Sequence, residues 1–144
     1  MKLRLLLSTL CLALAAGTAA AHHSFAMFDR DNQMVLTGQV TEFYWQNPHV
    51  YIHLQAPDAK GNSRVWIIEC ANPGILNRAG WKFNKVKKGD QLTLVVSPYR
   101  TGEPAALLHQ IRFADGSILE NGASAGPPRI SIDTGKPLQA SAAK

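Results

Sequence analysis

The sequence contains little charge and few cysteines. Of its 144 residues, 17% are charged, 46% are apolar and two are cysteines. The apolar fraction is large enough for a modest core, which excludes a wholly disordered chain. After the first few dozen residues no apolar run is long enough to cross a bilayer, so we do not expect an integral membrane protein. The length predicts one domain and excludes a large multidomain enzyme.

Recognisable catalytic motifs are also missing. We find no carboxylate pair at a fixed spacing, no serine or cysteine nucleophile motif, no phosphate-binding loop and no H-E-x-x-H or C-x-x-C pattern. The sequence therefore favours a binding protein over an enzyme, and we assign no catalytic residues.

Residues 1–21 have the features of a secretory signal peptide. Lys2 and Arg4 form a short positive region, residues 5–16 are apolar, and three alanines at 19–21 provide the small residues of a cleavage site. We therefore expect a periplasmic or secreted protein with no transmembrane span in the mature chain. Loss of the two positive charges lowers the formal charge from +5 to +3, which is too small to indicate binding to nucleic acid.

Removal of the leader also removes Cys11 and leaves Cys70 as the single cysteine, so no internal disulfide can form. A lone thiol in an oxidising compartment is safest when it is buried. Cys70 follows the apolar run of residues 65–68, and we interpret it as a small core residue.

Alternating apolar residues separated by turn residues predict short β-strands. The predicted strands cover residues 34–45, 49–54, 64–70, 91–97, 107–113 and 117–119. Gly38 marks a bend or bulge in the first strand. Asn72 as a cap, Pro73 at the first helical position and Gly80 beyond the end predict one short helix over residues 72–80.

This order of elements predicts a mainly β fold. Three strands, a short helix and then further strands within about 90 residues are typical of a small OB-like Greek-key β-barrel of about five strands, with the helix between strands three and four. An immunoglobulin-like sandwich is the alternative, but it needs about seven strands and has no place for that helix. We predict a signal peptide (1–21), an N-terminal arm (22–32), a barrel domain (33–119) and a disordered tail (120–144), which has few apolar anchors.

The histidines at the predicted mature terminus carry the strongest chemical signal. Cleavage after Ala21 gives His22 a free α-amine, which together with its ring nitrogen forms a chelate that suits copper and needs one further imidazole. Cleavage after Ala20 instead exposes Ala21, His22 and His23. Their amine, two backbone amides and third-position imidazole form a square-planar Cu(II) or Ni(II) site. Both outcomes favour copper.

A further ligand has to come from the barrel. His49 follows the Asn47-Pro48 turn, which offers the arm an accessible end of the barrel, so we favour His49 over His53 and His109. His53 lies four residues further on, about 13 Å away at strand rise, so the two cannot share one ion.

The predicted metal site therefore consists of His22, His23 and His49. Met27 is an auxiliary candidate because a thioether suits Cu(I), and His53 is the second one. The sequence favours the simpler interpretation of Met27, as an ordinary hydrophobic residue next to Phe25 and Phe28.

The alternative function is a periplasmic interaction module without a metal, which recognises a partner protein or an envelope glycan through an aromatic and basic face. The aromatic residues are Tyr44, Trp45, Tyr51, Trp66 and Trp81, and the basic ones are Arg78, Lys82, Lys85, Lys87 and Lys88.

Six separated blocks of the sequence stand out together. They are HHSFAMFD at 22–29, TGQVTEF at 37–43, WQNPHV at 45–50, RAGW at 78–81, GD at 89–90 and ADG at 114–116. In this order they resemble a family of small exported bacterial proteins defined by a domain of unknown function. The resemblance spans about residues 22–119 and implies export, and it draws attention to the His-His start and the Asn-Pro-His turn without implying an activity. The chain departs from the pattern at Ser97-Pro98, where members often place a histidine before the proline.

Overall fold

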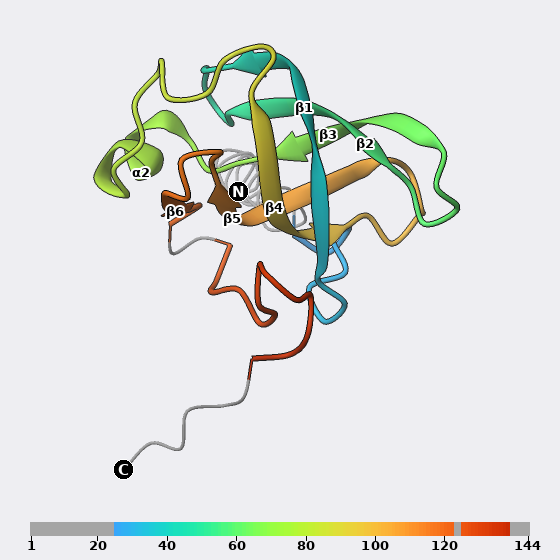
Figure 1. Cartoon of the computed structure of the whole chain (residues 1–144). Helices are drawn as coiled ribbons and strands as arrows, with labels where there is room; N and C mark the ends of the chain where they lie inside the picture. The colour runs from blue at the N-terminus through green and yellow to red at the C-terminus, as the bar shows by residue number, and fades with distance from the viewer. Residues whose placement is uncertain (1–24, 123–124, 139–144) are drawn as a thin grey trace, which may run out of the picture.

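The computed structural model describes residues 25–122 and 125–138. A curled six-stranded sheet forms its centre, and one short helix lies at an end of the sheet (Figure 1). The elements are β1 (Met34–Tyr44), β2 (Tyr51–Pro57), β3 (Ser63–Glu69), α2 (Pro73–Arg78), β4 (Gln91–Pro98), β5 (Ala105–Arg112) and β6 (Ile118–Glu120).

Five of the strands close into a barrel. Each of β2 and β4 pairs with β1, β3 pairs with β2, and β5 pairs with β4, all antiparallel. The ring closes through a short parallel pairing of β3 with β5, from Ile67 opposite Ala105 to Glu69 opposite Leu107. The predicted OB-like barrel of five strands, with its helix between the third and fourth, is confirmed. A two-sheet sandwich would lack this closing pair.

Strand β1 belongs to both halves of the barrel. Its first half, to Gln39, pairs with β4, and its second half pairs with β2. Gly38 lies where the two pairings meet, and a Cβ built on it would be only 2.2 Å from the carbonyl oxygen of Gln55 in β2. The register shifts just beyond, between Val40 and Glu42. Glycine is therefore needed at this position because the backbones approach closely.

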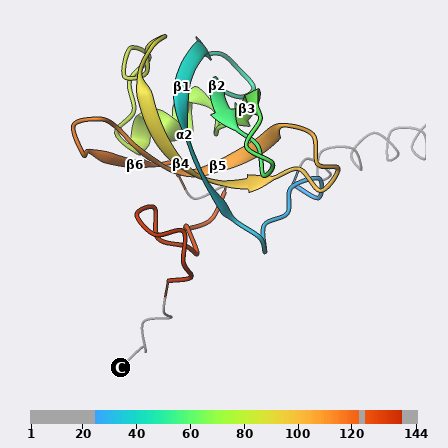
Figure 2. The ribbon, with the colours of Figure 1, turned by 45° about the vertical axis from the view of Figure 1, so that its right-hand side comes forward.

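Helix α2 begins where its capping residues predict. The Asn72 side chain accepts a hydrogen bond from the Ile75 backbone N–H at 2.9 Å, and Pro73 occupies the first turn. Leu76 is completely buried in the barrel core. Figures 1 and 2 show α2 at one end of the barrel, while the β2–β3 and β4–β5 hairpin loops lie at the other end.

The segment after β6 differs from the predicted disordered tail. Ile130 and Ile132 are buried and pack against Val95 and Val35 on the outside of the barrel. Figure 2 shows this orange-red segment beneath the barrel. The segment contains few apolar residues, but Ile130 and Ile132 lie against apolar side chains on the outer faces of β1 and β4. Residues 139–144 lie outside the described part of the chain.

No helix within the described residues is long and apolar enough to span a membrane. The predicted signal peptide, residues 1–21, lies outside that part of the chain.

Candidate functional site

The N-terminal arm is held against the β4–β5 hairpin. Phe28 is buried and forms an isolated β-bridge with Tyr99, and the two rings contact edge to face at 4.9 Å between centroids. The Arg100 N–H donates to the Met27 carbonyl at 2.9 Å, and the Asp29 N–H donates to the Pro98 carbonyl at 2.7 Å. The barrel therefore fixes where the chain arrives from its N-terminus.

Phe25, the first described residue, lines a cavity of about 180 Å³ together with His49 and Glu69. Leu107 of β5 adds an apolar wall, and Phe25 packs in the same cluster as Leu107. We call this the arm cavity. Phe25 follows the predicted ligands His22 and His23 closely in the sequence, and His49 is the ligand predicted from the barrel. The arm cavity therefore brings these two parts of the predicted metal site close together.

His49 lies before β2 rather than within it, because the strand begins at Tyr51. Its Nδ1 is 3.2 Å from the Cys70 carbonyl oxygen and 3.2 Å from Oε1 of Glu69. Two oxygen acceptors at this nitrogen favour the tautomer that has its proton there. Nε2 then keeps its lone pair, which is the arrangement of a metal-ligating histidine held by its second nitrogen.

The carboxylate beside His49 lies in a poorly solvated place. Burial raises the pKa of the Glu69 carboxyl, and the neighbouring imidazole acts in the opposite direction. Cys70, the next residue, is buried in the core, as predicted, and burial raises the pKa of its thiol far above the ordinary range. A thiol held protonated in this way is not a ready metal ligand.

His53 has a carboxylate partner of its own. Its Nδ1 is 3.1 Å from Oε2 of Glu42, and its ring contacts Tyr44 edge to face at 5.1 Å between centroids. Tyr44 also donates a hydrogen bond to the same carboxylate, which lowers the pKa of Glu42. His53 thus repeats the local chemistry of His49, but it lies within β2, on the outward face between β1 and β3.

His109 has no nitrogen available for a metal. Its Nε2 is 2.8 Å from the Ser97 hydroxyl, its Nδ1 is 3.1 Å from the Gly126 carbonyl oxygen, and the residue is buried. Sequence reasoning missed this Ser97–His109 pair, because the two residues lie on different strands and no local pattern joins them. The pair gives a structural reason for preferring His49 to His109.

Of the remaining predicted ligands, only Met27 belongs to the part of the chain that the structure describes. It lies on the arm and is 44% exposed. His22 and His23 lie outside the described residues. Within residues 25–122 and 125–138, no group of three or more histidine, cysteine, aspartate or glutamate side chains is arranged to hold a metal ion.

A family model matches residues 10–108, which is more than half of the sequence, and it describes a family of unknown function, DUF6152. The chain belongs to the DUF6152 family. The predicted resemblance is thereby confirmed. A comparison with curated proteins finds none that matches the chain.

Two solved structures are similar to this DUF6152 chain in fold. Both are crystal structures of the mitochondrial single-stranded DNA-binding protein Rim1 from S. cerevisiae, one of them labelled with selenomethionine. Each is 18% identical and covers 62% of this chain. The alignments cover 95% and 96% of the Rim1 chains, with TM-scores of 0.41 and 0.42.

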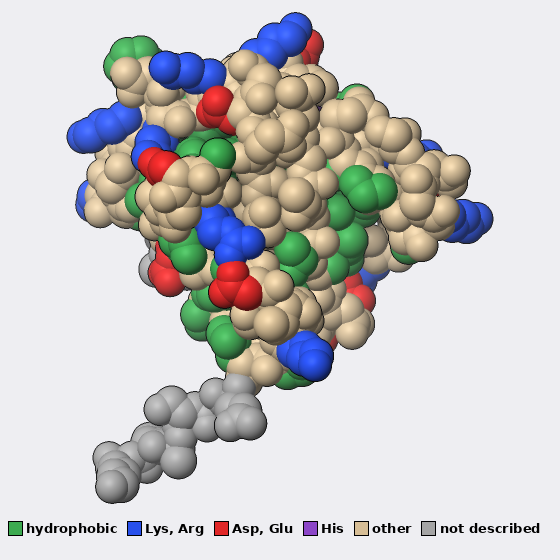
Figure 3. Space-filling model, in the orientation of Figure 1, with side chains coloured by type: hydrophobic (Ala, Val, Ile, Leu, Met, Phe, Trp, Pro, Cys, Tyr) green, Lys and Arg blue, Asp and Glu red, His purple; other side chains and the backbone are tan. Residues whose placement is uncertain are grey.

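The aromatic and basic residues of the alternative function do not form one face in this DUF6152 barrel. Trp66 and Trp81 are buried in the core, whereas Tyr44 and Tyr51 are neighbours on β1 and β2. On the face shown in Figure 3, the lysine and arginine side chains are spread over the surface rather than gathered in a patch.

Proposed function

We propose that the protein is exported and binds one copper ion between its mature N-terminus and His49. The observation that carries this proposal is that Phe25 and His49 line the same cavity. The signal-peptide features of residues 1–21 supply the export and the new terminus.

The segment between His22 and Phe25 is short enough to keep the mature N-terminus close to His49. Three residue steps separate Phe25 from His22, and an extended chain covers at most about 3.6 Å per residue. The His22 amine and ring therefore have a reach of about 10 Å from the arm cavity. His23 is two residue steps from Phe25 and therefore has a shorter reach of about 7 Å, and it takes the place of His22 if the peptidase cuts one residue earlier.

The donor set suits copper. One amine and two imidazole nitrogens form a planar set of nitrogen ligands, which favours copper over the hard cations. Glu69 would act on this site through His49, because its carboxylate holds Nδ1 and leaves Nε2 free to bind a metal ion. Phe25 and Leu107 provide an apolar wall beside the ion.

The test compares two histidines that share the same local chemistry. The exported protein is purified, and its intact mass is measured with and without added Cu(II). The mass identifies the first residue and counts bound ions. We expect one copper per chain, at least a tenfold weaker affinity in His49→Ala, and an unchanged affinity in His53→Ala.

Three results would contradict the proposal. They are a mature chain that begins beyond His23, a protein that stays metal-free after dialysis against Cu(II), and equal affinities in the two variants. A rise in Tm with Cu(II) that disappears in chelator supports binding to the folded state.

A partner-binding module remains the second candidate, and the outer face of β1–β3 favours it. Tyr44 on β1 and Val65 and Ile67 on β3 are large side chains that are exposed. Glu42 and Glu69 lie on the same face, and their charge is unsuited to a phosphate backbone. This face fits a protein partner better than nucleic acid, and Ile67→Asp should abolish such an interaction while copper binding persists.

A further inference from the structure

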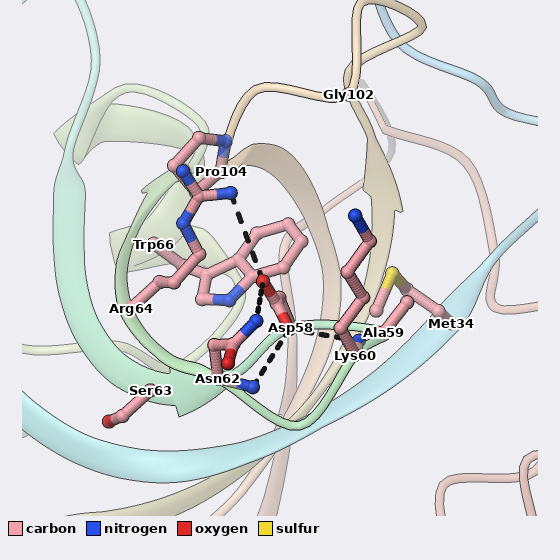
Figure 4. Close-up of a pocket in the computed structure, with 10 residues that line it drawn as sticks. All are labelled: Met34, Asp58, Ala59, Lys60, Asn62, Ser63, Arg64, Trp66, Gly102 and Pro104. Atoms are coloured by element: carbon pink, nitrogen blue, oxygen red, sulfur yellow. Dashed lines mark hydrogen bonds and ion pairs between the residues drawn. The ribbon is translucent and has the colours of Figure 1, made fainter.

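A second and larger cavity lies at the opposite end of the barrel from α2. Its volume is about 710 Å³, and it is lined by the β2–β3 hairpin, the start of β1 and the loop before β5 (Figure 4). We call it the mouth cavity. Small-molecule sites in proteins usually have volumes between about 300 and 1,000 Å³, and the mouths of β-barrels are a common place for them. The copper proposal does not use this cavity.

Trp66 forms the back of the mouth cavity (Figure 4). The residue is only 7% exposed, and its Nε1 is buried with no hydrogen-bond acceptor among the described residues. The other buried tryptophan behaves differently, because Nε1 of Trp81 donates to the Glu120 carbonyl at 2.8 Å. A buried donor without an acceptor is costly and needs an explanation.

Asp58, the acidic residue among those lining the cavity, already has hydrogen-bond and ion-pair partners. Oδ1 of Asp58 accepts from the backbone N–H groups of Lys60 and Asn62, each at 2.9 Å. The hydrogen bond from the Asn62 N–H is the main cause that holds the pKa of Asp58 below its usual range. Oδ2 faces Arg64 at 3.9 Å. Asp58 therefore shapes the hairpin and partly neutralises Arg64.

Lys60 is the uncompensated charge of the cavity. Within the described chain it has no carboxylate oxygen within 4.0 Å, whereas Arg64 has one. Figure 4 shows the two cationic side chains on opposite sides of the indole. Met34 and Pro104 add apolar surface to the lining. The cavity lining thus combines one free positive charge, an apolar wall and a tryptophan whose buried N–H has no acceptor among the described residues.

We propose that the mouth cavity binds a small organic carboxylate with an apolar body, such as an aromatic acid. Its carboxylate pairs with Lys60, one of its oxygens accepts from Nε1 of Trp66, and its apolar body lies against Met34 and Pro104. Because Nε1 of Trp66 is buried, this contact requires the neighbouring Arg64 to move aside, and Arg64 is half exposed and has only a long contact with Asp58. An inorganic anion would leave the apolar surface unused, and a neutral amide would leave Lys60 unpaired.

The test follows the indole N–H resonances of the ¹⁵N-labelled full chain by NMR, with benzoate as the probe. The Trp66 signal is assigned from the variant Trp66→Phe. We expect saturable binding and a shift of the Trp66 indole proton to lower field, as a new hydrogen bond forms. The Trp81 indole proton, which already has an acceptor, should stay in place.

A matched pair of lysine variants tests the charge. Lys60→Gln should weaken benzoate binding about tenfold, the usual size of a lost charge-assisted contact. Lys87→Gln, on the loop after α2 and outside the cavity, should leave it unchanged. Both positions are exposed, so neither substitution threatens the fold.

The proposal is overturned if benzoate does not saturate, if the Trp66 signal stays in place while benzoate binds, or if the two lysine variants bind equally. It is also overturned if benzamide or sulfate produces the same shift as benzoate, because the carboxylate and the apolar body would then not act together.

Discussion

At the scale of single residues, the two buried tryptophans differ in one hydrogen bond. Trp81→Phe removes the donor to the Glu120 carbonyl, whereas Trp66→Phe removes an N–H that has no acceptor in the described chain. Both substitutions delete similar volume from the core. We therefore expect Trp81→Phe to lower the free energy of unfolding by about 1 kcal/mol more than Trp66→Phe. Urea denaturation without added ligand measures the difference, and a larger loss in Trp66→Phe would show that the indole nitrogen has a partner.

His109 should make stability depend on pH. Burial lowers its pKa, the Gly126 carbonyl opposes this, and the charges of Arg30 and Arg129 lower it further. In the unfolded chain its pKa returns to about 6.5. Below that pH the unfolded state binds more protons than the folded state, so stability falls as the pH is lowered through 6.5 and rises as it is raised.

Two histidine variants isolate this contribution. The free energy of unfolding is measured at pH 7.5 and at pH 5.5 in the parent, in His109→Gln and in His53→Gln. We expect the loss between the two pH values to shrink in His109→Gln and to persist in His53→Gln. An unchanged loss in His109→Gln would mean that another group causes the pH dependence.

At the scale of elements, β1 joins the two halves of the barrel, because it pairs with both β2 and β4. A Cβ on Gly38 would collide with the backbone of β2 at Gln55, where no flexible side chain can move away. Gly61, in the β2–β3 turn, has open space around it, and its φ of +82° is the only obstacle to a side chain. We expect Gly38→Ala to cost about 3 kcal/mol by overpacking and Gly61→Ala about 1 kcal/mol by backbone strain.

Chemical denaturation of the two glycine variants separates steric collision from backbone strain. Equal losses would show that β1 and β2 can separate locally without cost. Gly38 also shows what a strand pattern in the sequence can predict and what it cannot. Its presence in a long strand predicts an irregularity, but which strand approaches it depends on the pairing of β1 with both β2 and β4.

At the scale of the whole molecule, residues 125–138 join the arm to the barrel. Arg129 pairs with Asp31 at 2.9 Å, and its backbone N–H donates to the Gln33 side chain. Ile132 is buried against the outside of the barrel, whereas Leu138 is 51% exposed. The segment therefore helps to set the path of the chain that leads to the arm cavity.

A pair of truncations to alanine tests whether this segment belongs to the cooperative fold. Ile132→Ala should lower the free energy of unfolding by about 2 kcal/mol, since it removes a buried side chain. Leu138→Ala should change it by less than about 0.5 kcal/mol, as expected at an exposed position. If Ile132→Ala is neutral in thermal and urea unfolding, the segment unfolds independently of the barrel.

The sequence alone determined the features that depend on neighbours in the chain. Apolar alternation located the strands to within a few residues, because side chains on successive strand residues point to opposite faces. Asn72, Pro73 and Gly80 located the helix, because capping is local. The blocks around the His-His start and the Asn-Pro-His turn predicted the family.

Only the tertiary structure decided what depends on residues far apart in the chain. The Ser97–His109 pair, the carboxylate beside His49 and the unpartnered nitrogen of Trp66 each require a specific strand pairing that no local pattern specifies. The same holds for Ile130 and Ile132, whose burial depends on an apolar outer face of the barrel. Local periodicity sets which face a side chain occupies, whereas the closed barrel sets what that side chain meets.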